Sequence, residues 1–126
     1  MKVYHDDGDG ITDRSVKYLK QLLEDSIFTP LSLCVMYDRE FSFELKGMMQ
    51  WKDLRQITGT DKSEPCVILL SGCNCGYGGE GPHGTLECLK LLGNFTFIDQ
   101  NVILSEKHVH IDFQCLTVTT GQASGR

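Results

Sequence analysis

Residues 66–93, CVILLSGCNCGYGGEGPHGTLECLKLLG, decide the fold. The run begins after a proline with five apolar residues, 66–70, which is typical of a buried β-strand. Its last twelve residues, 82–93, open with Pro82 and end at Gly93, the usual order at the two ends of an α-helix. Six glycines fall within residues 71–84 between these segments. The sequence therefore predicts a buried strand joined to a helix by a glycine-rich loop.

The first 26 residues predict a second junction of the same kind. Residues 2–4 read as a short strand, and residues 5–12, HDDGDGIT, form an acidic loop. Residues 12–26 then predict a helix with Thr12 or Asp13 as the N-cap. If the two strands are parallel neighbours, both loops leave the same edge of the sheet, where open α/β sheets bind ligands. The apolar residues at helical spacing are Val16, Leu19, Leu22 and Leu23.

The remaining patterns complete a mixed fold. Residues 31–38 and 41–47 predict a hairpin, residues 48–57 a short helix, and residues 95–106 and 108–118 two further strand-like runs. The resulting order, β-α-β-β-(α)-β-α-β-β, predicts an α/β or α+β fold with a single mixed sheet covered by two main helices. We expect one globular domain over residues 1–120 and a flexible C-terminal tail over residues 121–126.

Composition excludes several classes of function. The 126 residues carry a net charge of −5, from 12 basic and 17 acidic side chains, without a basic cluster. We therefore expect no long nucleic acid as a partner. No apolar run reaches membrane-spanning length, and the N-terminus lacks the order of a signal peptide, so a cytoplasmic protein without membrane contact is expected. The six cysteines are then expected to be reduced thiols.

The glycine-rich loop is the main candidate for ligand binding. Its backbone amides would approach a phosphate or carboxylate closely, and a helix N-terminus follows. Thr85 would add a hydroxyl, and Tyr77 would stack on a base or sugar. The loop matches neither the dinucleotide-binding pattern nor the P-loop, which needs a lysine before Thr85. The candidate residues are Asn74, Gly76, Tyr77, Gly78, Gly79, Glu80, Gly81, His83, Gly84 and Thr85.

The acidic loop suggests a complementary role. Its candidate residues are Asp7, Asp9, Gly10 and Thr12. Their oxygens would accept hydrogen bonds from ribose hydroxyls or an amine, or hold a divalent cation beside a phosphate. An EF-hand reading fails because its twelfth position would be Val16, where a glutamate is needed.

Cysteines and histidines leave alternatives open. Cys73 and Cys75 with His83 would suit a zinc site or a nucleophilic cysteine with its base. The competing interpretation is a pair of partly buried loop thiols, and we expect no metal and no cofactor. The alternating side chains His108, His110 and Asp112 resemble half of a metallo-hydrolase motif, but the exposed face of an amphipathic strand is the favoured explanation. Three arginines, Arg14, Arg39 and Arg55, are candidates to reach a ligand phosphate.

These patterns favour a small binding protein over an enzyme. We expect it to sense, carry or sequester a phosphorylated or nucleotide-like ligand without chemistry, because no complete catalytic set of residues is visible. The alternatives are a transferase or hydrolase with Cys73 or Cys75 as nucleophile, and a protein-interaction module. Exposed hairpin edges also suggest a homo-oligomer.

Overall fold

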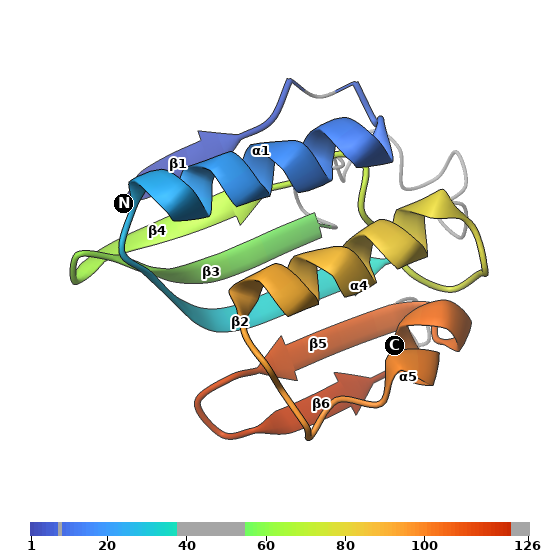
Figure 1. Ribbon diagram of the computed structural model, residues 1–126. Helices are drawn as coiled ribbons and strands as arrows, with labels where there is room; N and C mark the ends of the chain where they lie inside the picture. The colour runs from blue at the N-terminus through green and yellow to red at the C-terminus, as the bar shows by residue number, and fades with distance from the viewer. Residues whose placement is uncertain (8, 38–54, 122–126) are drawn as a thin grey trace.

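The computed structural model describes residues 1–7, 9–37 and 55–121, and within them the chain forms one mixed sheet and three helices, an α+β fold (Figure 1). In chain order the elements are β1 (Lys2–His5), α1 (Thr12–Asp25), β2 (Phe28–Met36), β3 (Arg55–Asp61), β4 (Glu64–Leu69), α4 (Glu80–Leu92), α5 (Gln100–Ser105), β5 (His108–Asp112) and β6 (Thr117–Thr120). The single mixed sheet with two main helices is as the sequence predicts.

The six described strands lie in the order β1-β4-β3-β2-β5-β6. Strand β1 pairs with β4 in parallel, with Lys2 opposite Cys66 and His5 opposite Leu69. The other described pairs are antiparallel. The two strands before the loops are therefore parallel neighbours, which is the condition for both loops to leave the same edge of the sheet. Both loops leave the sheet at the carboxyl ends of β1 and β4.

Helices α1 and α4 lie side by side across one face of the sheet (Figure 1). The strand registers align one row of apolar side chains beneath them: Tyr4, Ile68, Ile57, Leu33 and Ile111. Apart from the half-buried Tyr4, this row is buried, and Leu19 of α1 and Leu89 of α4 join it in the core. Burial of this face is the main stabilising contribution to the fold. Among the described helices, none has the length and apolarity to cross a membrane.

The opposite face of the sheet carries more polar side chains. The hydroxyls of Ser32 and Thr58 lie 2.6 Å apart on neighbouring strands. His108, His110 and Asp112 are half-buried on this face, whereas Val109 and Ile111 between them are fully buried. The alternation expected of an amphipathic strand is thus confirmed.

Three local predictions differ from the structure. The strand-like run over 108–118 is two strands, β5 and β6, joined by a turn at residues 113–116. Residues 95–106 do not form a strand, because α5 occupies Gln100–Ser105 and the carboxylate of Asp99 accepts a hydrogen bond from the Asn101 N–H at its start. The short helix predicted over 48–57 is wrong at its end, since residues 55–57 belong to β3. The rest of that segment, the strand over 41–47, Arg39 and tail residues 122–126 lie outside the described residues.

Candidate functional site

The two loops after the parallel strands bind each other directly. We call residues 6, 7 and 9–11 the acidic loop and residues 70–79 the glycine loop. The Gly10 N–H donates to Ser71 Oγ at 3.0 Å, and the Thr12 hydroxyl donates to the Gly72 carbonyl at 2.7 Å. A Cβ on Gly72 would lie 2.6 Å from the carbonyl carbon of Ile11. Only glycine allows the two backbones to approach this closely.

A buried carboxylate ties the loops to α1. Asp6 is 4 % exposed, and its Oδ2 accepts hydrogen bonds from the Ser71 N–H at 2.9 Å, the Ser71 hydroxyl at 3.1 Å and the Ser15 hydroxyl at 2.5 Å. The Ser15 oxygen in turn accepts from the Gly72 N–H at 2.9 Å. Burying a carboxylate is costly unless it is hydrogen-bonded, so this network fixes the relative position of the two loops.

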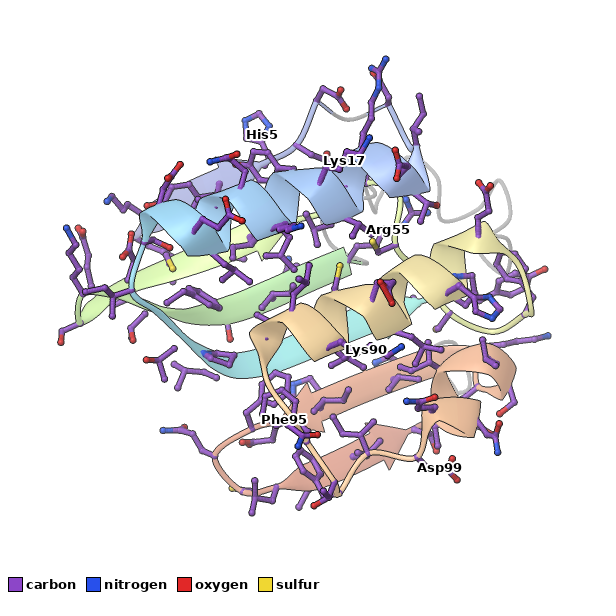
Figure 2. All side chains as sticks on the ribbon, viewed as in Figure 1. His5, Lys17, Arg55, Lys90, Phe95 and Asp99 are labelled. Atoms are coloured by element: carbon purple, nitrogen blue, oxygen red, sulfur yellow. The ribbon has the colours of Figure 1, made fainter. Side chains whose placement is uncertain are left out.

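An open pocket of about 370 Å³ lies between the loops. Arg55, at the start of β3, is only 9 % exposed and donates from Nη1 to the Ser71 carbonyl. Figure 2 shows Arg55 between α1 and α4, toward the end of the sheet where both loops lie. We call this the junction pocket; the described residues that line it are Gly10, Thr12, Arg55, Ser71, Gly72, Asn74, Tyr77, Glu80 and Gly81.

Both long helices begin at the junction pocket. Helix α1 begins at Thr12, and Ile11, with extended backbone, precedes it. The prediction of Thr12 or Asp13 as the N-cap is therefore wrong. The Thr12 hydroxyl instead donates to the Gly72 carbonyl of the glycine loop. Helix α4 begins at Glu80 after Gly79. Because the first N–H groups of a helix have no partner within it, both starts present partial positive charge toward the pocket.

Six of the residues predicted to bind ligand line the junction pocket: Gly10, Thr12, Asn74, Tyr77, Glu80 and Gly81. The predicted carboxylates of the acidic loop lie elsewhere. Asp7 and Asp9 are exposed and pair with the Arg14 guanidinium, at 3.3 and 2.5 Å. The Asp9 N–H and Arg14 hold the pKa of Asp7 below its ordinary value. Glu80 therefore supplies the pocket's carboxylate, in place of Asp7 and Asp9.

The other predicted glycines do not line the junction pocket. The Gly76 N–H donates to the Ile103 carbonyl at 2.9 Å, and Gly79 lies against the Tyr77 ring, while Gly78 is exposed. Gly84 lies inside α4, where a Cβ would meet the Thr12 methyl at 2.3 Å.

Thr85 is buried in α4, away from the pocket lining. Its hydroxyl donates to the Asn74 carbonyl at 2.6 Å, which holds the glycine loop against the helix. The interior of α4 thus supports the pocket from behind.

Sequence reasoning missed part of the pocket lining. Ser71 and Gly72 follow the buried strand directly, and their place at the carboxyl end of β4 was the available signal. Arg55 was one of three arginines that the sequence could not rank. Its place in the pocket follows from the pairing of β3 beside β4, where Gln56 lies opposite Leu69.

The described thiols do not form the predicted zinc site. Cys73 and Cys75 are 3 % and 0 % exposed. His83 is exposed, and its Nδ1 lies 2.8 Å from the Gly79 carbonyl oxygen. Among the described residues, no group of three or more histidine, cysteine or acidic side chains is placed to hold a metal ion. The geometry therefore favours the interpretation of Cys73 and Cys75 as buried loop thiols.

The fold and pocket together define an α+β domain with an open, ligand-sized pocket at the carboxyl ends of its parallel strand pair. Comparison with protein-family models, with curated proteins and with solved structures yields no match. The function proposed below therefore rests on the geometry of the junction pocket.

Proposed function

We propose that this protein binds a small phosphorylated molecule, of the size of a mononucleotide or sugar phosphate, in the junction pocket. One observation carries the proposal: the pocket lies beyond the carboxyl ends of two parallel strands and includes the buried guanidinium of Arg55 in its wall. Crevices at this edge of α/β sheets are the usual place for ligands. The volume of about 370 Å³ lies at the lower end of small-molecule sites and suits a mononucleotide better than a dinucleotide.

The positive charge in the pocket would hold the phosphate. Arg55 brings a guanidinium, whose planar fork suits phosphate oxygens. The start of α4 adds the backbone of Glu80 and Gly81, and the start of α1 adds that of Thr12. Pro82 in the first turn of α4 has no N–H, so the donors of this helix are concentrated at its first two residues. Guanidinium and helix N-termini favour an anion in the same way.

Other lining residues suit the uncharged part of such a ligand. Tyr77 is half-buried at the pocket and offers a ring on which a base or sugar face can stack. Glu80 offers carboxylate oxygens as acceptors for sugar hydroxyls. A carboxylate repels a phosphate, so we expect Glu80 to face the hydroxyl-bearing part of the ligand.

The proposal contains no chemical step. The described lining holds no cysteine or histidine, so binding in order to sense, carry or sequester the ligand fits the pocket best. We extend the proposal to a cytoplasmic homo-oligomer. Its support is the sheet order, in which the four-residue strands β1 and β6 are the edges of the described sheet and offer backbone groups to a second copy.

Calorimetric titration with AMP, ribose 5-phosphate, inorganic phosphate and adenosine tests the proposal. AMP is expected to bind at least tenfold more tightly than adenosine, because charge-assisted hydrogen bonds to the phosphate are each worth about 1.5–3 kcal/mol. Arg55→Gln should weaken AMP binding about tenfold or more, with a smaller effect on adenosine. Equal affinities for AMP and adenosine, or no binding of any of the four compounds, would contradict it.

Arg14→Gln is the matched control for the arginine. Arg14 is exposed and pairs with Asp7 and Asp9 rather than lining the junction pocket. Its replacement removes the same charge and should leave AMP affinity within about twofold, as expected for a surface substitution. Because Arg55 also bonds the Ser71 carbonyl, thermal unfolding of Arg55→Gln and Arg55→Lys separates loss of folding from loss of phosphate binding.

A further inference from the structure

Two buried thiols contact each other behind the junction pocket. Cys73 Sγ of the glycine loop lies 3.7 Å from Cys88 Sγ of α4. The residues are 3 % and 1 % exposed, so both sulfurs lie in the core. The described cysteines are free thiols in this structure. A disulfide requires the sulfurs to approach to about 2.05 Å, a movement of less than 2 Å here.

The position of Cys73 connects this thiol pair to the pocket wall. Its neighbours in sequence, Gly72 and Asn74, both line the junction pocket. Gly72 accepts the hydrogen bond from Thr12, and the Asn74 carbonyl accepts that from Thr85, one turn before Cys88 on α4. A movement of Cys73 toward α4 therefore shifts the part of the pocket wall between Gly72 and Asn74.

We propose that Cys73 and Cys88 form a reversible disulfide that switches the junction pocket from a binding to a weakly binding state. The effect on affinity rests on the proposed function, whereas formation of the bond does not. Closing the bond draws Cys73 toward α4 and away from α1. The Thr12 hydrogen bond to Gly72 then lengthens, and the pocket loses the wall that Gly72 provides.

Hydrogen peroxide is the oxidant in this proposal. The thiolate of Cys73 attacks one peroxide oxygen, the O–O bond breaks, and the other oxygen leaves as water after taking up a proton. The Cys88 sulfur then attacks the sulfenic sulfur of Cys73, the S–S bond forms, and the second oxygen leaves as water. Two thiols lose two electrons and two protons, and one peroxide becomes two waters. An external dithiol reverses the reaction and becomes a disulfide itself.

The two thiols have different roles in this order. The hydrogen bond with Cys73, followed by burial, raises the pKa of Cys88 well above that of an ordinary thiol. Cys88 therefore stays protonated and is the poorer nucleophile toward peroxide. Cys73 lies in the glycine loop between two residues of the pocket lining, Gly72 and Asn74, whereas Cys88 lies within α4. This assigns Cys73 as the attacking thiol and Cys88 as the resolving thiol. Because both thiols are buried, we expect the oxidation to be slow.

The test uses the full chain with Cys115→Ser, because Cys115 is exposed and would otherwise link two molecules. The protein is treated with peroxide, its remaining thiols are alkylated, and the Cys73 and Cys88 peptides are identified by mass spectrometry. We expect one Cys73–Cys88 disulfide. We also expect AMP affinity to fall about tenfold, a usual coupling between two sites, and to recover with dithiothreitol. Cys88→Ala in the same background should show neither change, and Cys73→Ser serves if Cys88→Ala fails to fold.

Three outcomes overturn the proposal: alkylation of both Cys73 and Cys88 after peroxide, a disulfide from Cys73 to a different cysteine, or a Cys73–Cys88 disulfide that leaves AMP affinity unchanged. If the reduced protein binds no AMP, the proposed function fails separately. Amide hydrogen exchange at Gly72 and Asn74 then shows whether the disulfide loosens the pocket wall. Faster exchange in the disulfide form supports it, and equal exchange in both forms overturns it.

Discussion

The acidic loop and the glycine loop occupy equivalent places after two parallel strands, but they are held in different ways. The glycine loop is buried over residues 71–75, and the N–H groups of Ser71 and Gly72 donate to the side chains of Asp6 and Ser15. In the acidic loop only Asp6 is buried among the described residues, and Asp7 and Asp9 are held by an exposed ion pair with Arg14. Exposed ion pairs contribute little to stability, whereas buried contacts contribute much. With Cys73 and Cys88 reduced, the glycine loop is therefore the more firmly held wall of the junction pocket, and the acidic loop is the less firmly held one.

The largest expected effect comes from the closest contact between the loops. Gly72→Ala places a methyl group 2.6 Å from the backbone of Ile11 and Thr12, which cannot move without breaking the junction. We expect a loss of about 3 kcal/mol in the free energy of unfolding, the upper end for overpacking. Urea unfolding measures it.

Gly78→Ala is the control for Gly72→Ala. It lies in the same loop, with no atom within 4 Å of the added methyl group. Its stability should stay within about 0.5 kcal/mol of the original protein. Equal losses in the two variants would show that the glycine loop is not held by its contact with the acidic loop.

Asp6→Ala is expected to have the next largest effect, because it removes the buried carboxylate that joins both loops to α1. It leaves the Ser71 N–H and the Ser15 hydroxyl without their acceptor. We expect a loss of about 2 kcal/mol, the cost of an unsatisfied buried group. Thermal unfolding measures it, with the exposed Asp13→Ala as control. A loss of stability no larger than that of Asp13→Ala would show that the Asp6 carboxylate does not hold the two loops together.

Gly10→Ala tests the backbone conformation of the acidic loop, because the added methyl group would cause no steric clash. Gly10 has φ +74°, and an added Cβ would meet nothing within 4 Å. Left-handed backbone disfavours side chains by about 1–2 kcal/mol, so Gly10→Ala should destabilise by about 1 kcal/mol. Gly10→Asn should cost less, because asparagine tolerates this conformation. Equal stability of Gly10→Ala and the original protein in urea would show that the acidic loop relaxes freely.

The smallest expected effect is a pH dependence of the acidic loop. The pKa of Asp7 is lowered in the fold, first by the Asp9 N–H and then by Arg14. Its stabilising contribution is therefore complete above the ordinary aspartate pKa of about 4 and is lost as the pH falls through the lower folded value. NMR titration should show Asp7 protonating at a pH below the ordinary aspartate pKa. In Arg14→Gln the Asp7 midpoint should move upward, and an unchanged midpoint would remove Arg14 from the explanation.

The sequence predicted the two strand–loop–helix junctions because long apolar patterns and helix-end residues are local signals. It failed where local signals are short. Helix α5 has six residues, too few for helical periodicity, and its β-branched residues Val102 and Ile103 favoured a strand. Asp99, three residues before Val102, is an N-cap signal that was available and not used.

The pocket lining was predictable in part for the same reason. Residues that follow the strands, such as Asn74 and Gly10, are found from their place in a junction. Arg55 reaches the pocket only because β3 pairs beside β4, and strand order depends on long-range pairing that no local pattern contains. Likewise Gly72 and Gly84 have no room for a side chain because of contacts with Ile11 and Thr12, far away in sequence.

The pairing of β1 with β4 also constrains the order of folding. Lys2 lies opposite Cys66, so β1, although made before β4, has no partner among the described strands until β4 has left the ribosome. Contacts this distant in sequence slow folding, because a long stretch of chain must be ordered before they form. Closure of β1 onto β4, with Asp6 and Ser71 meeting across it, is thus a late event in synthesis, and the pocket comes into existence only with that step.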